Sequence, residues 1–162
     1  MKLKIKFLSH LAQEIYSQNP LKYETFGSAG IDIRAIKMKT IEGGEIDLKV
    51  QNFILKPQAR VLIQVGFATE FEAGYELQIR PRSGLAWQNG ITVINSPGTI
   101  DSDYRGEIGV IILNTSDIDF EVTLGDRIAQ MIVAKYEIPL ITLTDEISDS
   151  QRGSGGLGST GI

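Results

Sequence analysis

The sequence predicts an all-β fold, a distorted jelly-roll β-barrel or sandwich. Three observations predict it: apolar and polar residues alternate with period two along most of the 162 residues, the alternating runs are short, and Gly, Asn, Asp and Pro separate them. Hydrophobic residues make up 42% of the chain and charged residues 22%, as in ordinary globular domains. A chain of this length buries a core without disulfide or metal support.

Strands are expected wherever the alternation is clearest. These runs are residues 2–7, 31–36, 46–50, 61–65, 76–80, 91–94, 107–113, 120–124 and 128–133. One short helix is expected after Pro81, where Ser83 can cap its start and Asn89-Gly90 can end it. Residues 11–16 are compatible with a helical turn. Trp87, the one tryptophan of the chain, is expected to pack in the core.

The C-terminus differs in composition from the rest of the chain. From Asp145 the sequence is polar, and it ends in RGSGGLGSTG, which is rich in glycine. We therefore expect a β domain over residues 1–144 and a flexible glycine-rich tail over residues 145–162. Two interpretations of the tail stay open at this point: a mobile terminus without contacts, or a wrap for phosphate built from backbone amides, hydroxyls and one arginine.

Charge and residue counts exclude several function classes. Lys plus Arg number 16 against 20 for Asp plus Glu, a net charge of −4, so we expect no broad basic face and no nucleic-acid partner. Cys is 0 and His is 1, which excludes disulfides, cysteine nucleophiles and Cys/His zinc sites. An enzymatic base is then expected to be a carboxylate. No apolar run has the length of a membrane span, so we expect a soluble, intracellular, cytoplasmic protein.

Four stretches could carry chemistry, and each has an ordinary structural alternative. Arg82 and Ser83 at a helix start could bind an anion, or simply begin a surface helix. Asp101, in a hairpin over residues 95–110, could act as a general base, or merely favour a turn. Asp32 in residues 28–35, and Arg127 with Gln130 in residues 125–130, could instead lie on outward faces of strands, with a surface salt bridge.

The order of these stretches is more informative than any one of them. SAGIDIRA, PRSGLA, NSPGTIDSDYRGEIGV, GDRIAQ and RGSGGLGSTG follow one another from residue 28 to residue 161. Together they resemble the five motifs of the homotrimeric dUTP diphosphatase (dUTPase) family. The resemblance implies jelly-roll subunits in a trimer with three shared active sites. It implies that one subunit supplies the first, second and fourth motifs of a site, a second subunit the third motif, and the third subunit a tail that closes over the nucleotide.

The resemblance also implies a reaction and a role for individual residues. The reaction is hydrolysis of dUTP to dUMP and pyrophosphate, which limits uracil incorporation into DNA and supplies dUMP for dTMP synthesis. Asp101 is the implied catalytic residue, which activates a water for in-line attack on the α-phosphorus. Mg²⁺ is the implied cofactor, held by phosphates and water with no direct protein ligand, and Asp32 orients one of those waters. The implied substrate-binding residues are Arg82, Ser83, Gly84, Asn95, Gly98, Thr99, Ile100, Tyr104, Gly109, Gln130, Arg152, Leu157, Gly158, Ser159 and Thr160.

One position departs from the family pattern, and two other functions stay open. Leu157 stands where the family tail usually has an aromatic residue that stacks over uracil. The first alternative is a dCTP deaminase-like enzyme, which shares the fold and needs a glutamate near the base; Glu107 is the only nearby glutamate. The second is a regulatory protein on the same trimer whose contacts with a partner are modulated by nucleotide.

Overall fold

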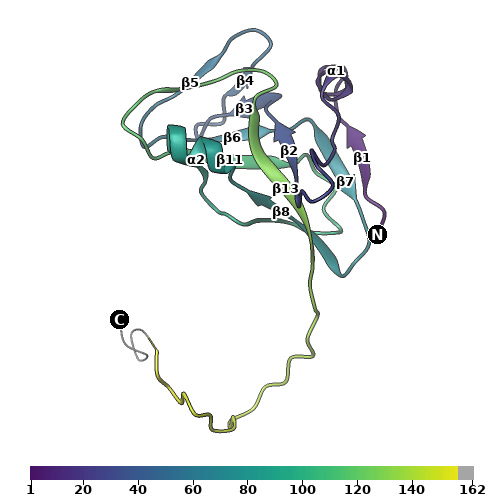
Figure 1. Cartoon of the computed structure of the whole chain (residues 1–162), viewed down its shortest axis with the longest axis vertical. Helices are drawn as coiled ribbons and strands as arrows, with labels where there is room; N and C mark the ends of the chain where they lie inside the picture. Colours follow the sequence, from purple (N-terminus) through teal and green to yellow (C-terminus); the bar gives the residue numbers. More distant parts are fainter. Residues whose placement is uncertain (157–162) are drawn as a thin grey trace.

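The computed structural model describes residues 1–156, and its architecture is all-β with two short helices in that range (Figure 1). The strands are β1 (Lys4–Phe7), β2 (Gly30–Arg34), β3 (Lys37–Lys39), β4 (Glu45–Asp47), β5 (Phe53–Leu55), β6 (Arg60–Gln64), β7 (Phe67–Glu70), β8 (Tyr75–Arg80), β9 (Ile91–Val93), β10 (Gly98–Ile100), β11 (Gly109–Asn114), β12 (Phe120–Val122) and β13 (Arg127–Lys135). The helices are α1 (His10–Gln18) and α2 (Ser83–Asn89). The all-β prediction is confirmed.

Among the described residues the strands form four antiparallel sheets. The two larger ones have the orders β10-β8-β13-β2 and β4-β3-β6-β11-β9, and the pairs β1-β7 and β12-β5 complete the fold. The inner faces of both larger sheets supply one apolar core. Its fully buried side chains include Ile33, Met38, Ile63, Leu77, Ile108, Ile112 and Met131. The arrangement is a sandwich in which no described sheet closes on itself.

All nine expected strands overlap a strand of the structure, and four further strands were not expected. Three of these, β3, β5 and β10, have only three residues each; β4, β9 and β12 are equally short, but their alternating runs extend beyond the strand. The fourth, β7, has the sequence FATE and buries three residues in succession, so the period-two pattern is absent. Periodicity therefore misses short strands without a longer alternating run, and it misses β7, which is buried on both faces.

The expectation of one short helix is wrong, because α1 is a second one. Ser9 caps α1 by accepting a hydrogen bond from the amide of Ala12 at 3.1 Å. Ala12 and Tyr16 lie four residues apart, on one face of the helix, and both are buried. Tyr16 stacks on Phe7 and meets Phe67 edge-on, so α1 covers the β1-β7 pair (Figure 1). In the sequence, this helix was indicated only as a helical turn compatible with residues 11–16.

Two expectations about α2 are also corrected. The helix ends at Gly90 in the left-handed conformation (φ 66°), as predicted. However, its N-cap residue is Arg82 and makes no side-chain capping hydrogen bond, so Ser83 is the first helical residue rather than the cap. Trp87 is 90% exposed instead of buried in the core. The helix α2 lies on the surface and none of its residues is buried, so the Trp87 side chain faces solvent in this chain.

The chain leaves the sheets after β13. Residues 136–156 form no helix or strand, and Figure 1 shows them leading away from the sandwich. Several large apolar side chains on this segment are exposed, among them Ile138, Leu140 and Leu143. The predicted division of the chain at residue 144 stays a prediction. Within residues 1–156, neither helix has the length and apolar character needed to cross a membrane.

Candidate active site

The first, second and fourth motifs meet at the carboxylate of Asp32. Asp32 lies between buried Ile31 and Ile33 on β2, so its side chain faces away from the core. Arg82 donates from Nε to Asp32 Oδ1 at 3.0 Å, and Arg127 donates from Nη1 to Oδ2 at 3.1 Å. Arg82 also donates from Nη1 to the carbonyl of Arg127 at 3.3 Å. Both carboxylate oxygens are therefore engaged by guanidinium groups, and two cations face one anion.

Gln130 holds the start of α2 beside this cluster. On β13 it lies opposite Asp32 of β2 on one side and Arg80 of β8 on the other. Its Nε2 donates to the carbonyl of Pro81 at 2.9 Å, directly before Arg82. Ser83 and Gly84 follow and are exposed, and the first amides of a helix have no intrahelical acceptor. Exposed amides beside a surplus positive charge make this end of the sheet suitable for an anion.

The residues that the sequence assigned to base and sugar line two adjoining cavities. The smaller cavity, of about 60 Å³, is lined by Asn95, Gly98, Thr99, Ile100 and Gly109, together with Ile79, Val93 and Val110. The larger one, of about 280 Å³, is lined by Thr99, Ile100, Asp101, Tyr104 and Gly109, together with Leu62 and Glu107. Asp101 and Tyr104 thus share a cavity, and three residues are common to both cavities.

The loop that follows β10 is compact around Tyr104. The Tyr104 hydroxyl donates to the carbonyl of Glu107 at 3.1 Å, and its amide donates to the carbonyl of Asp101 at 3.2 Å. Arg105 donates from Nη1 to the carbonyl of Ser102 at 2.7 Å. A Cβ atom at Gly106 would overlap the Tyr104 ring, so only glycine lets the ring lie this close to the backbone. Asp101 itself is exposed at the entrance of this loop.

Asp101 and Arg82 of one chain lie far apart. The register of β10 on β8 places Ile100 opposite Leu77, so Asp101 continues towards Glu76. Arg82 lies six residues beyond Glu76 in the other direction, which at about 3.3 Å per residue is about 20 Å. Asp32 is further still, because β13 and β2 lie on the opposite side of β8 from β10. One chain therefore presents two half-sites, which we call the arginine cluster (Asp32, Arg82, Arg127, Gln130) and the hairpin cavities.

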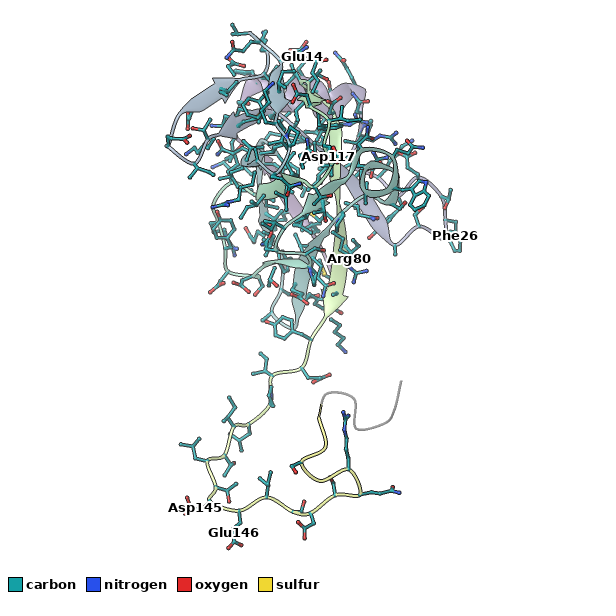
Figure 2. All side chains as sticks on the ribbon, turned by 90° about the vertical axis from the view of Figure 1, so that its left-hand side faces the viewer. Glu14, Phe26, Arg80, Asp117, Asp145 and Glu146 are labelled. Carbon is teal, nitrogen blue, oxygen red and sulfur yellow. The ribbon has the colours of Figure 1, made fainter. Side chains whose placement is uncertain are left out.

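The described part of the tail, residues 145–156, makes no side-chain hydrogen bond or salt bridge with either half-site of this chain. Figure 2 shows Asp145 and Glu146 on the segment that leads away from the sheets, and Arg152 follows further along it. Arg152 donates from Nε to the carbonyl of Gly155 at 2.9 Å. The predicted tail residues Leu157, Gly158, Ser159 and Thr160 lie outside the described residues.

Arg127 is a further member of the arginine cluster. In the sequence it belonged to a stretch that could carry chemistry, with a surface salt bridge as the alternative, and it was not among the implied substrate-binding residues. Its partner Asp32 is 95 residues away in the chain. The signal that could have found it is its place in the motif GDRIAQ, which also carries Gln130. Among residues 1–156, no group of three or more His, Cys, Asp or Glu side chains could hold a metal ion.

Comparison with known proteins decides the family. Residues 35–161 match the dUTPase family over most of the chain. The chain belongs to the dUTPase family. Its relatives include the deoxyuridine 5'-triphosphate nucleotidohydrolase of Nautilia profundicola, 47% identical over 161 residues, covering 99% of each chain. The enzyme of the same name from Treponema denticola is 48% identical over 141 residues, which cover 87% of this chain and 90% of the relative.

Solved dUTPase structures have the same fold. A dUTPase of Staphylococcus bacteriophage 80alpha aligns with a TM-score of 0.77 and 22% identity over 98% of both chains. The D95N dUTPase of phage phi11 of S. aureus, described as coordinating a structural Mg(II) ion, aligns with a TM-score of 0.72 and 18% identity over 92% of this chain and 100% of that one. The resemblance drawn from the five motifs is confirmed, and the chain is an enzyme of the dUTPase family with a jelly-roll type of fold.

Proposed function

We propose that this dUTPase-family enzyme hydrolyses dUTP to dUMP and pyrophosphate by in-line attack of water on the α-phosphorus. The observation that carries the proposal is the pairing of two half-sites: a narrow cavity built from a hairpin, and a cluster with surplus positive charge beside exposed amides. The first suits a flat, polar base. The second suits a chain of phosphates.

Base recognition is assigned to the smaller hairpin cavity. Main-chain groups of a hairpin present fixed donors and acceptors, and Asn95 adds an amide that offers both. Such a set can distinguish uracil from cytosine, because the two bases differ in donor and acceptor pattern. The small volume of the cavity, about 60 Å³, favours rejection of a base that carries a 5-methyl group. Tyr104 in the adjoining cavity is assigned to the deoxyribose, where its ring leaves little room for a 2'-hydroxyl.

Asp101 is assigned as the general base. It shares the larger cavity with Tyr104, and its side chain is exposed to solvent that can supply the attacking water. With no cysteine in the chain and a single histidine, His10, a carboxylate is the available base. Positioning and charge neutralisation at the phosphates are expected to supply most of the remaining acceleration.

The donor set fits Mg²⁺ held by the substrate. Residues 1–156 offer no cluster of metal-ligating side chains, and the oxygens of Asp32 are engaged by two arginines. Mg²⁺ keeps several waters and commonly binds through substrate phosphates, so a triphosphate can supply the ligands that the protein lacks. Bound in this way, the ion neutralises phosphate charge. Orientation of one of its waters by Asp32 stays a prediction.

The distance between the half-sites supports the assignment of shared sites in a homotrimer. Asp101 and Arg82 of one chain are separated by about 20 Å along β8. The α-phosphate, however, must lie close both to the general base, Asp101, and to the phosphate-binding groups. A second copy can bring its hairpin cavities to the arginine cluster of the first. The tail of a third copy, with Arg152 and the residues around Leu157, is then assigned to close over the nucleotide.

From this function we infer a role in nucleotide metabolism and a location inside the cell. Removal of dUTP limits uracil incorporation into DNA, and dUMP is the precursor for dTMP. Because dUTP is formed inside cells, we assign the enzyme an intracellular, cytoplasmic place. The deaminase alternative is weakened because the carboxylate of Glu107 already accepts hydrogen bonds from Gly66 and Gln64.

Pyrophosphate release tests the proposal most directly. The enzyme is given dUTP, dCTP, dTTP and UTP with Mg²⁺, and each assay is repeated with excess EDTA. We expect release from dUTP alone, lost in EDTA. Ammonia from dCTP would replace the proposal with the deaminase, and tight dUTP binding without turnover would replace it with the regulatory protein.

A further inference from the structure

We propose that Glu107 is a positioning residue that fixes the Asp101 loop against the turn between β6 and β7. The inference rests on the proposed function, because its consequence is the placement of the general base. The Glu107 side chain is only 14% exposed. Its Oε1 accepts a hydrogen bond from the amide of Gly66 at 2.9 Å, and its Oε2 accepts one from Gln64 Nε2 at 2.6 Å. Lys37 Nζ lies 3.6 Å from Oε2.

The backbone of Glu107 connects this anchor to the general base. Its carbonyl accepts the Tyr104 hydroxyl at 3.1 Å, and the Tyr104 amide donates to the carbonyl of Asp101 at 3.2 Å. Three hydrogen-bonded steps therefore run from the β6-β7 turn to Asp101. Glu107 also lines the cavity that holds Asp101 and Tyr104. A shift of the Glu107 side chain would be transmitted to both residues.

The support at the other end is rigid. Gly66 has a φ of +78°, and its carbonyl accepts the amide of Leu8 at 2.9 Å. A Cβ atom there would lie 2.5 Å from Ala12 Cβ and 2.9 Å from Ile36 Cγ1, so the turn is packed tightly under α1 and only glycine fits. The Gly66 amide is thus a fixed donor. The Glu107 carboxylate adds a side-chain anchor to it, next to the backbone hydrogen bonds of Ile108 with Val65 and Phe67.

Gln64 offers a way to separate hydrogen bonding from charge. Its Oε1 is buried and has no hydrogen-bond partner among the described residues, while its Nε2 donates to Glu107. In Glu107→Gln, the new Oε1 can still accept from Gly66, and the Gln64 amide can turn so that its free oxygen accepts from the new Nε2. This variant keeps the anchor and loses only the charge. Glu107→Ala removes the anchor, and Glu107→Asp withdraws the carboxylate by one methylene.

The experiment compares Glu107→Ala, Glu107→Asp and Glu107→Gln with wild type for kcat and KM on dUTP and for amide hydrogen exchange over residues 101–108. We expect the Ala and Asp variants to lose about tenfold to a hundredfold in kcat, with KM changed much less and with faster exchange in the loop. The Gln variant should stay near wild type in all three readouts. Glu121→Ala is the matched control, because Glu121 is an exposed glutamate on β12 whose carboxylate accepts from Asn52 at 2.9 Å.

Each outcome decides the inference. Wild-type kcat and loop exchange in whichever of the Ala and Asp variants folds would overturn it. So would a loss in Glu107→Gln as large as that in Glu107→Asp, since charge rather than anchoring would then be responsible. If wild type itself fails to hydrolyse dUTP, the proposed function fails, and the exchange measurement still tests the anchor alone.

Discussion

Asp32 and Arg82 are 50 residues apart in the chain and meet at 3.0 Å, Oδ1 to Nε. The second oxygen of the same carboxylate accepts from Arg127. One anion therefore orients two guanidinium groups and leaves the cluster with a positive surplus. Both Asp32 and Arg82 are about four-fifths buried, so the arrangement is less screened than a surface salt bridge. We predict that Asp32 in this way orients both cations for the phosphates of the proposed substrate.

Asp32→Asn should lower kcat on dUTP by about tenfold or more, because the amide cannot accept from both arginines and misplaced groups cost that much or more. The free energy of unfolding should fall by about 1–3 kcal/mol, as for a lost hydrogen bond to a charged group. Activity and urea unfolding check both effects. A Mg²⁺ titration separates the two roles assigned to Asp32: a loss that high Mg²⁺ restores would mean that ordering metal-bound water, rather than aiming the arginines, is its main role.

Asp101→Asn should keep nucleotide binding and lose about 10²-fold to 10⁴-fold in kcat, the usual contribution of a general base. Binding of the non-hydrolysable analogue dUpNHpp by calorimetry and pyrophosphate release from dUTP give the two quantities. Asp103→Asn is the matched control, because Asp103 is an exposed aspartate of the same loop that does not line the hairpin cavities. Near-normal turnover of Asp101→Asn would remove Asp101 from the base role.

Mixed trimers should recover activity from two inactive variants. Arg82→Ala damages the arginine cluster and Asp101→Asn damages the hairpin, and in a shared site the two defects fall on different subunits. Random mixing in equal amounts should restore about one quarter of the sites. A working site needs an intact arginine cluster from one subunit and an intact hairpin from another, and each is present with a probability of about one half. Co-expression with two affinity tags and a pyrophosphate assay measure this. Activity no higher than that of the separate variants would place both half-sites of a working site in one chain.

The sequence predicted the fold class and the grouping of Asp32, Arg82 and Gln130 better than it predicted contacts between distant segments. Alternation located nine strands, most clearly β2 and β11, in which buried residues alternate with less buried ones. It missed β7, whose Phe67, Ala68 and Thr69 are all buried. It placed Trp87 in the core because tryptophan is usually buried, whereas the burial of a helix depends on neighbours that the sequence does not reveal.

Contacts between distant segments could not be predicted from the sequence, because it does not reveal which segments become neighbours. The motif order brought Asp32, Arg82 and Gln130 together correctly as one group. The pairing of Asp32 with Arg127, and the anchoring of Glu107 on Gly66 41 residues earlier, depend on strand register. Asp101 and Arg82 lie near opposite ends of β8. This placement likewise depends on the register of β10 on β8 and not on the spacing of the motifs.

Leu157→Phe should lower KM for dUTP and leave kcat within a few-fold. Position 157 lies outside the described residues. An aromatic ring stacks on a base with about 1–3 kcal/mol, and leucine replaces this interaction only partly. Steady-state kinetics on wild type, Leu157→Phe and Leu157→Ala give an ordered series in which the alanine variant has the highest KM. A higher KM in the phenylalanine variant would mean that the site is shaped for leucine.

Tyr16→Phe should destabilise the fold by about 1–3 kcal/mol, because it leaves the partly buried Arg34 amide without the acceptor that it has in wild type. The Tyr16 hydroxyl accepts from the Arg34 amide at 2.9 Å, two residues after Asp32, and the side chain is 3% exposed. Urea unfolding at pH 7 measures the loss. Tyr23→Phe is the matched control, since Tyr23 is an exposed tyrosine and its hydroxyl should contribute little.

The same variant has a pH dependence with a definite sign. Burial raises the pKa of Tyr16 above its ordinary value. Above about pH 10 the unfolded chain therefore ionises this group while the folded chain does not, and wild type loses up to about 1.4 kcal/mol per pH unit from it. Tyr16→Phe lacks this loss, so the stability gap between the two proteins should narrow between pH 9 and pH 11. A gap that stays constant over this range would mean that Tyr16 ionises equally in both states and that its hydroxyl is not held in the core.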